Sequence, residues 1–172
     1  VRPLPYSSNL PVQNLSAAQN VTSRQVYSIS NYNGAIYWYS VMGFRVRSIS
    51  NGQFEDYQVQ GQSSYSHFLV ATADGLFWQN GYSGALFNHN LTLNDGSSPM
   101  AVGQVGVQAR PGLVVRTANA FYWAEDVDQC QNGVVCHIYE YFLNQRVLHP
   151  VVTFPAGKGA LGLYVDSTHL YY

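Results

Sequence analysis

A chain of 172 residues is long enough for one ordinary domain with a sizeable core. Only 10% of the residues are charged, and the formal net charge is −1, which gives no electrostatic footprint for nucleic acid or an anionic membrane surface. No apolar run approaches the roughly 18 residues of a membrane span. The 14 tyrosines favour an all-β protein, because a tyrosine on a half-buried sheet buries its ring and keeps its hydroxyl accessible.

Residues 1–22 contain three prolines and show little periodicity, so we predict an extended arm or linker there. Two N-glycosylation sequons begin in this region, at Asn14 and Asn20, and a third begins at Asn90. Three sequons in a short chain predict a secreted or cell-surface glycoprotein.

Residues 23–172 repeat a triplet made of an apolar residue, then Phe or Tyr, then Trp or Tyr. The third positions fall at 38, 78, 123 and 172, so they are 40, 45 and 49 residues apart. A period of 40 to 50 residues is typical of β-propeller blades. The triplets occupy 36–38, 76–78, 121–123 and 170–172, and we expect their aromatic pairs to be structural anchors: Tyr37 and Trp38, Phe77 and Trp78, Tyr122 and Trp123, and Tyr171 and Tyr172.

Each triplet follows an apolar strand and a short polar turn, which predicts a β-hairpin. A second hairpin follows each of the first three triplets, over residues 44–60, 84–96 and 137–154. Helix signals are almost absent. The sequence therefore predicts an all-β fold of β-propeller repeats, each 40–49 residues long and forming a four-stranded antiparallel blade, with three complete blades and part of a fourth.

Cys130 and Cys136 flank a short segment with Asn132 and Gly133 at its centre, the strongest signal for a two-residue hairpin turn. We predict a disulfide that closes this loop and contributes about 2 kcal/mol. A disulfide would place the protein in an oxidising compartment.

The acidic run that begins at Glu125 contains Asp126 and Asp128, spaced like the start of a calcium loop. The EF-hand pattern fails because Cys130 and Gln131 stand where a ligand and a glycine are required. Asp126 and Asp128 are therefore weak metal candidates, and a solvated acidic loop is expected. No cofactor is predicted.

No nucleophile elbow, phosphate loop or dinucleotide fingerprint is present in the sequence. A propeller glycoside hydrolase would need paired carboxylates, and the candidates Asp56, Asp74, Asp126 and Asp166 lie at differing places in their repeats. We therefore expect a protein that is not an enzyme.

The triplets resemble those of the YWTD family of β-propellers, found in lipoprotein-receptor and related ectodomains. In that family an Asp near the end of one strand precedes the aromatic pair. Asp166, six residues before Tyr172, matches that position, and Tyr32, Thr72 and Thr117 take its place in the other repeats.

The resemblance covers about residues 24–172, although the Thr-Asp half of the family motif is missing and only Glu125 is acidic there. It implies an extracellular, six-bladed, non-enzymatic module that binds protein ligands. Six blades would need roughly 270 residues, so the resemblance implies that this chain is part of a propeller.

The expected function is protein–protein interaction, adhesion or assembly by a non-catalytic extracellular β-propeller module. Its partner would be a protein ligand or neighbouring domains, with no nucleic acid and no membrane insertion. The first alternative is a carbohydrate-binding, lectin-like propeller or β-trefoil that binds glycans, and the second is a fragment of a propeller glycoside hydrolase.

The disulfide prediction can be tested by alkylating the native protein before and after reduction. We expect mass spectrometry to find Cys130 and Cys136 modified only after reduction, because the predicted disulfide would bond both sulfurs. Alkylation of both thiols without reductant would contradict the prediction.

Overall fold

The computed structural model describes residues 26–40, 45–50, 53–58, 66–80, 83–91, 98–105, 109–130 and 133–172. The predicted arm and the sequons at Asn14 and Asn20 lie outside these residues. Within the described part of the chain, no helix has the length and apolar character needed to cross a membrane. The helix recorded there is one short 3-10 turn, η2 (Val127–Gln129).

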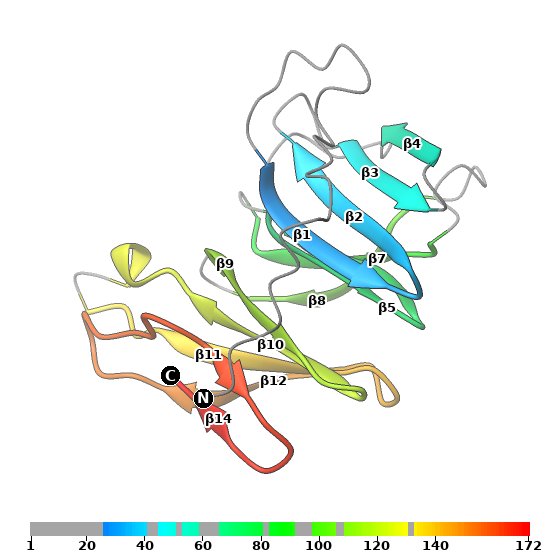
Figure 1. Ribbon diagram of the computed structural model, residues 1–172. Coiled ribbons are helices and arrows are strands. Elements are labelled where there is room, and N and C mark those ends of the chain that lie inside the picture. The colour runs from blue at the N-terminus through cyan, green and yellow to red at the C-terminus, as the bar shows by residue number, and fades with distance from the viewer. Residues whose placement is uncertain are drawn as a thin grey trace, which may run out of the picture.

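The described residues form three four-stranded antiparallel sheets and one hairpin, in chain order (Figure 1). Sheet A contains β1 (Val26–Tyr32), β2 (Ala35–Ser40), β3 (Arg45–Ser50) and β4 (Gln53–Gln58). Sheet B contains β5 (Ser66–Thr72), β6 (Gly75–Asn80), β7 (Ala85–His89) and β8 (Met100–Gln104). Sheet C contains β9 (Ala109–Arg116), β10 (Ala120–Glu125), β11 (His137–Phe142) and β12 (Val147–Thr153), and hairpin D contains β13 (Tyr164–Val165) and β14 (Leu170–Tyr171).

This arrangement confirms the all-β class and the four-stranded antiparallel sheets. One strand was misplaced: we expected the fourth strand of the second repeat before Gly96, and it is β8 instead. The partly buried side chain of Val102 in β8 packs against the core between sheets B and C. This contact favours β8 as the edge strand of sheet B.

The first strands of the repeats, β1, β5, β9 and β13, contact one another in sequence. We call them the inner strands. Each aromatic triplet begins in the second strand of its sheet, in the same register against the inner strand: Trp38 lies opposite Ile29, Trp78 opposite Leu69 and Trp123 opposite Val114. The sheets are thus related as successive blades.

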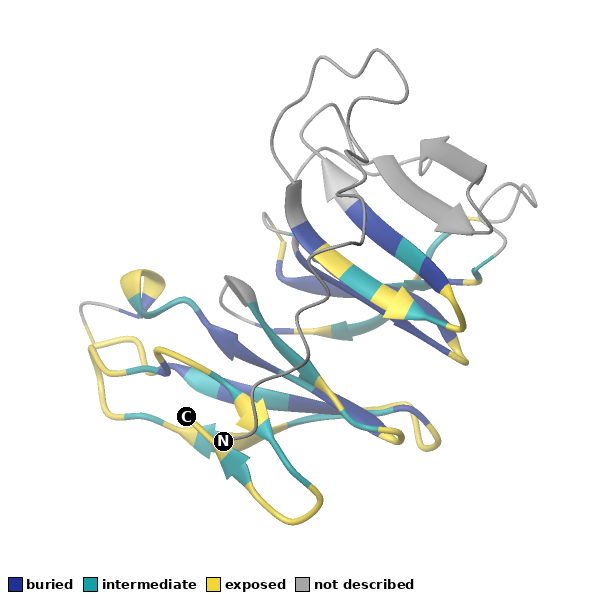
Figure 2. Ribbon diagram, viewed as in Figure 1, coloured by how far each residue is buried: buried dark blue, intermediate teal, exposed yellow. Residues whose placement is uncertain are grey.

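The core consists of side chains that fill the space between neighbouring sheets. Buried residues lie along strands of all three sheets (dark blue in Figure 2). Between sheets B and C, the ring of Phe77 lies 5.2 Å from that of Phe121, and the ring of Phe68 lies 5.3 Å from that of Trp123. All three anchor tryptophans are buried, as predicted. Each large side chain removed from water in this way stabilises the fold by roughly 1.5–3 kcal/mol.

The last anchor pair differs from the others. Tyr171 and Tyr172 continue the repeat register but are exposed. On one side of hairpin D, Leu163 and Leu170 pack against the core cluster of sheet C. Among the described residues no sheet covers the other side, and the role of Tyr171 and Tyr172 as repeat anchors stays a prediction.

Two serines join sheets A and B through hydrogen bonds between inner strands. Strand β5 is the edge of sheet B, so alternate backbone N–H groups along it point away from β6. Leu69 N–H donates to the hydroxyl of Ser28 at 2.9 Å, and Ala71 N–H donates to the hydroxyl of Ser30 at 2.9 Å. The two hydroxyls thus accept hydrogen bonds from backbone N–H groups of β5 that pair with no strand.

We expect Ser28→Ala to lower the free energy of unfolding by about 1–3 kcal/mol, because the substitution leaves the buried Leu69 N–H without its acceptor. Urea unfolding followed by circular dichroism measures this change. Ser167→Ala, at an exposed serine, is the matched control and should change stability by less than about 0.5 kcal/mol. Equal stability of the Ser28 variant and the wild type would show that the bond is dispensable.

Candidate interaction face

The turns that join each inner strand to its neighbour gather on one face of the molecule, which we call the hairpin face (Figure 1). The turns span residues 32–35, 72–75, 117–120 and 166–169. The first three turns share the lining of a pocket of about 450 Å³, and the last two share a groove of about 640 Å³. A face built from four stacked turns resembles the loop surfaces with which rigid β-scaffolds bind partners.

Three of the four turns are capped by a side-chain oxygen at the same register position. The hydroxyl of Thr72 accepts from Asp74 N–H at 3.1 Å and donates to the carbonyl of Gly75 at 3.2 Å. The hydroxyl of Thr117 accepts from Ala120 N–H at 3.0 Å and donates to its carbonyl at 3.1 Å. Each hydroxyl therefore fixes the direction in which its turn projects.

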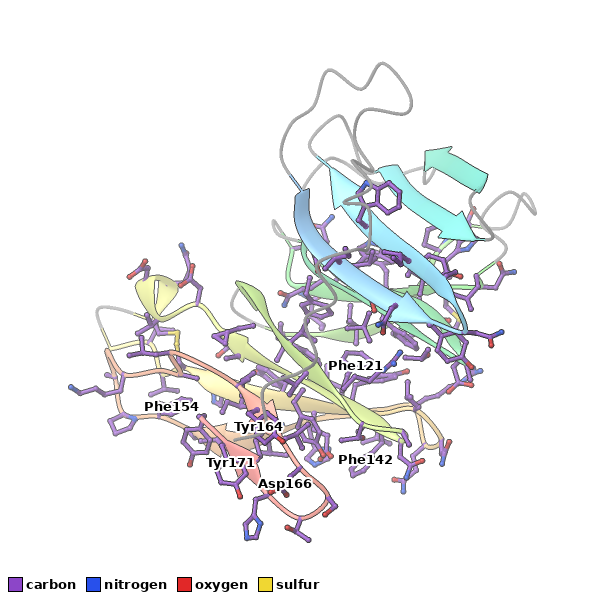
Figure 3. The ribbon with its side chains drawn as sticks, in the orientation of Figure 1. Phe121, Phe142, Phe154, Tyr164, Asp166 and Tyr171 are labelled. Atoms are coloured by element: carbon purple, nitrogen blue, oxygen red, sulfur yellow. A yellow bond between two sulfur atoms is a disulfide. The ribbon has the colours of Figure 1, made fainter. Side chains whose placement is uncertain are left out.

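Asp166 fills the same position in hairpin D (Figure 3). Its carboxylate accepts from the N–H groups of Thr168 and His169, both at 2.7 Å, and from the hydroxyl of Tyr171 at 2.9 Å. These hydrogen bonds, that from Thr168 N–H first, hold the pKa of Asp166 below its usual value. The Asp of the YWTD-like pattern thus acts here as a turn cap.

The first turn uses backbone conformation in place of a cap. Asn33 and Gly34 have φ values of +47° and +78°, the left-handed conformations that a tight hairpin requires. Gly75 is constrained further, because with φ at +121° a Cβ atom there would lie 2.2 Å from the carbonyl oxygen of His89. The two glycines are thus required for different reasons.

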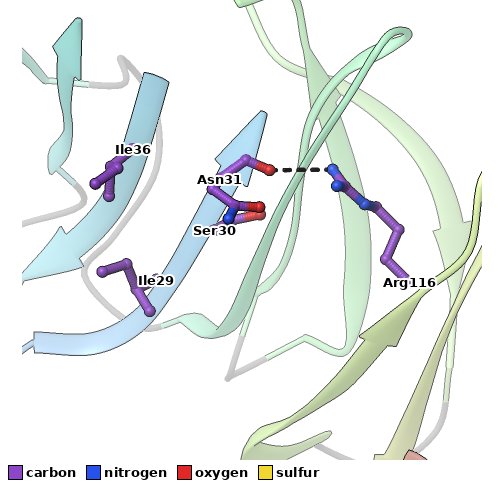
Figure 4. Close-up of a pocket in the computed structure, with 5 residues that line it drawn as sticks. All are labelled: Ile29, Ser30, Asn31, Ile36 and Arg116. Carbon is purple, nitrogen blue, oxygen red and sulfur yellow. Dashed lines mark hydrogen bonds between the residues drawn. The ribbon is translucent and has the colours of Figure 1, made fainter. Parts of the chain in front are cut away.

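Arg116 at the end of β9 connects three inner strands (Figure 4). One terminal nitrogen, Nη1, donates to the carbonyl of Asn31 at 3.2 Å and to the carbonyl of Ala71. These two residues hold the same register in sheets A and B as Arg116 in sheet C. The guanidinium also lies 5.8 Å from the ring centre of Tyr32. The positive charge of Arg116 is therefore held in a fixed place where the inner strands contact one another.

Two pockets flank this guanidinium. The pocket on the hairpin face is lined by Tyr32, Thr72 and Thr117 among others, and Arg116 is the one charged residue among its described lining residues. A second pocket, of about 440 Å³, opens beside Ile29 and Ile36 (Figure 4). The Nε and Nη2 groups of Arg116 donate to no residue that the structure describes. The cation can therefore accept a ligand from solvent.

The groove between sheet C and hairpin D contains a second polar cluster. Glu140 is buried at its base, accepts a hydrogen bond from the hydroxyl of Tyr122 and lies 3.2 Å from Nε2 of His149. Burial raises the pKa of Tyr122 to about 12, and the Glu140 carboxylate adds to the rise. The carboxylate has both oxygens engaged, which makes this cluster a fixed part of the groove wall.

A third cluster surrounds Glu125, which the sequence placed in a solvated loop. The structure corrects this, because the Glu125 side chain is buried and accepts from the backbone N–H and the ring Nδ1 of His137 at 2.8 and 2.9 Å. Burial raises the pKa of Tyr139 to about 12, with the charge of Glu125 as the next cause. Glu125 is therefore fixed inside sheet C.

The predicted disulfide is present beside this cluster, with the Cα atoms of Cys130 and Cys136 5.4 Å apart. Cys130 follows the 3-10 turn η2, and the linkage closes a loop between β10 and β11. The turn expected at Asn132 lies outside the described residues. Within the described residues, Glu125 and these cysteines form a group with metal-ligand spacing, but both sulfurs are bonded to each other.

The weak metal candidates lie next to the disulfide. The carboxylate of Asp126 accepts from the N–H of Asp128 at 3.4 Å and so caps η2, while the side chain of Asp128 is exposed. Their positions fit the solvated loop that we expected for these two residues.

The carboxylates considered for hydrolysis are dispersed over the structure. Asp74 and Asp166 lie in different turns of the hairpin face, Asp126 lies at η2, and the side chain of Asp56 is outside what the structure describes. Asn90 is exposed just after β7.

Sequence reasoning missed Arg116 and Glu140. One signal was present: Arg116 is a charged residue directly after the apolar run 113–115 of an inner strand, where the equivalent residues are Asn31 and Ala71. The pairing of Glu140 with His149 depends on the register of β11 and β12, which cannot be read from the sequence.

No family model and no curated protein matches the chain. A chain in the crystal structure of a nidogen/laminin complex is similar in structure, with 13% identity and a TM-score of 0.61, over 83% of this chain and 53% of that one. The extracellular domain of a hybrid two component system from B. thetaiotaomicron has 8% identity and a TM-score of 0.56, over 83% of this chain and 19% of that one. The computationally designed Ika4 protein has 9% identity and a TM-score of 0.54, over 88% and 86%.

At these identities the likeness concerns the fold alone, and it agrees with a β-propeller-like arrangement of the sheets. The chain spans about half the length of the first of these structures and about a fifth of the second, at 53% and 19%.

We expect Tyr139 to titrate near pH 12, because its phenol is partly buried and lies beside Glu125. Since this pKa exceeds the ordinary value of 10.0, the protonated phenol stabilises the fold below about pH 10, and the contribution is lost as the pH rises through about 12. Absorbance at about 295 nm follows the phenolate, and Tyr139→Phe should remove one late-titrating group from the curve. A late step of unchanged size in this variant would contradict the assignment, and unfolding in urea should bring the step back to about pH 10.

Proposed function

We propose that the chain is a non-catalytic, extracellular β-propeller module whose hairpin face binds a protein ligand, with Arg116 receiving a carboxylate of that ligand. One observation carries the proposal: a guanidinium held by two backbone carbonyls and a tyrosine ring keeps its Nε and Nη2 donors directed at no described residue.

The geometry around Arg116 favours a carboxylate over other anchors. A guanidinium offers parallel N–H donors that match the two oxygens of an Asp or Glu side chain. Because Nη1 is already bonded to Asn31 and Ala71, the side chain loses little freedom when a ligand binds. The uncharged pocket walls, with Tyr32 and two threonines, suit the apolar and polar neighbours of such a residue.

The structural neighbours support a protein partner outside the cell. One comes from a complex between nidogen and laminin, and another is an extracellular domain. The disulfide agrees with an oxidising compartment. The proposal includes adhesion and assembly as uses of the same face, while the lectin-like and hydrolase alternatives stay predictions of the sequence.

Selection from a library of random peptides of about 12 residues tests the proposal. We expect the selected peptides to carry Asp or Glu, and we expect Arg116→Gln to weaken their binding at least about tenfold, because a charge-assisted hydrogen-bond pair is lost. Fluorescence anisotropy of labelled peptides measures the affinities.

Arg146→Gln is the matched control, since Arg146 is exposed in the turn between β11 and β12, and it should leave binding unchanged. Arg116→Lys separates charge from geometry: it keeps the cation but loses the paired donors, so we expect intermediate affinity. Circular dichroism of each variant checks that the sheets are retained. Peptides without acidic residues, or peptides that bind the Arg116→Gln variant equally well, would overturn the proposal.

A further inference from the structure

The disulfide of sheet C, drawn in yellow in Figure 3, lies against a buried carboxylate. One oxygen of Glu125 and the sulfurs of Cys130 and Cys136 all lie within 4.8 Å of one another, and none of the three residues is more than 1% exposed. Glu125 ends β10, Cys130 follows η2 and Cys136 precedes β11. The fold thus gathers a carboxylate and two sulfurs, which are donor types that bind zinc in proteins.

The carboxylate is held in place by a neighbour on the next strand. Oε2 of Glu125 accepts from the backbone N–H of His137 at 2.8 Å and lies 2.9 Å from Nδ1 of the same residue. Carboxylates that bind metals are commonly held by hydrogen bonds of this kind, which set the direction of the ligand oxygens. Because His137 provides them, the position of Glu125 does not depend on the disulfide.

The backbone of both cysteines is also fixed independently of their sulfurs. The carbonyl of Cys130 accepts from Gly157 N–H at 3.1 Å, and the carbonyl of Cys136 accepts from Phe154 N–H at 2.8 Å. None of these bonds involves a sulfur, so reduction does not by itself break them. The two sulfurs of a tetrahedral zinc site lie about 3.8 Å apart, because each Zn–S bond is about 2.3 Å long. Cα atoms 5.4 Å apart allow this separation by rotation of the side chains.

We propose that the chain in its reduced form binds one zinc ion here, with Glu125, Cys130 and Cys136 as ligands and a water molecule at the fourth position. A dithiol reduces the disulfide to two thiols and is itself oxidised to a disulfide. Zinc then bonds to both sulfurs, and their two protons pass to solvent. Thiolate ligands select zinc over calcium and magnesium.

The disulfide and the metal are then alternative cross-links of the same loop, so the loop between β10 and β11 stays closed under oxidising and under reducing conditions. The site lies at the end of β10 away from the hairpin face, since Ala120 begins this strand beside the turn and Glu125 ends it. It shares no described residue with the lining of the Arg116 pocket. The zinc proposal therefore does not depend on the proposed function.

The test titrates the full chain with cobalt(II), which replaces zinc and absorbs visible light. A phosphine reduces the chain, because it leaves no competing thiol in solution. We expect one equivalent of cobalt to produce a thiolate charge-transfer band and the visible bands of a tetrahedral site, and zinc to remove both by displacement. The oxidised chain should show neither band, and excess calcium should leave the spectrum of the reduced chain unchanged.

Three variants identify the ligands. Glu125→Gln keeps the size of the side chain and an oxygen that accepts from His137, and we expect it to weaken zinc binding at least about tenfold, because the anionic ligand is lost. Cys136→Ser removes a thiolate and should weaken binding further. Asp128→Asn, at an exposed residue of the same loop, is the matched control and should bind like the wild type. Circular dichroism of each reduced variant checks that the sheets are retained.

Four results would each overturn the proposal: a reduced wild-type chain that binds no cobalt, an oxidised chain that binds it equally well, an unchanged affinity in Glu125→Gln, or a loss of binding in Asp128→Asn, which would place the metal in the acidic loop. The titration is repeated in urea, where only the cysteines remain near each other in the chain. We expect weaker binding there, and equal affinity would show that the fold contributes no ligand.

Discussion

The inner strands must satisfy their outward backbone groups without pairing to another strand, and the rest of the structure depends on how they do so. Sheets that splay around a common line leave one edge of each inner strand open. Side chains fill that role here: the hydroxyls of Ser28 and Ser30 accept from β5, and Arg116 donates to carbonyls of β1 and β5. Ala71 is bonded on both sides, by Ser30 at its N–H and by Arg116 at its carbonyl.

This solution differs between the two complete sheet junctions. Where sheet A presents Ser28 and Ser30, sheet B presents Phe68 and Val70, which join the aromatic core with sheet C. Sheets A and B are thus joined by hydroxyl hydrogen bonds beside their apolar core, whereas sheets B and C are joined by an aromatic core and by Arg116. The same arrangement gives Arg116 two roles, because the bonds that tie the strands together also hold the guanidinium at the mouth of the hairpin-face pocket.

The turns show how one structural requirement admits several residues. A carboxylate at Asp166 and hydroxyls at Thr72 and Thr117 all accept a turn N–H at the same register, because each places an oxygen a short distance from the backbone. In the first turn the left-handed Asn33 and Gly34 make that oxygen unnecessary. Asp166, Thr72 and Thr117 are therefore equivalent in the repeat, although only one of them is an Asp.

The sequence by itself determined most of the strands, the repeat and the disulfide, because alternation, aromatic triplets and a short cysteine spacing are local properties, but it misplaced β8. It also placed the three anchor tryptophans in the core, since bulky residues in a fixed register fill the space between blades. Only the tertiary structure decided the candidate site. Arg116 reaches residues 45 and 85 positions away, Ser28 reaches one 41 positions away, and Glu125 is buried because η2 and β11 fold over it. Such contacts depend on how whole sheets pack, which no local pattern encodes.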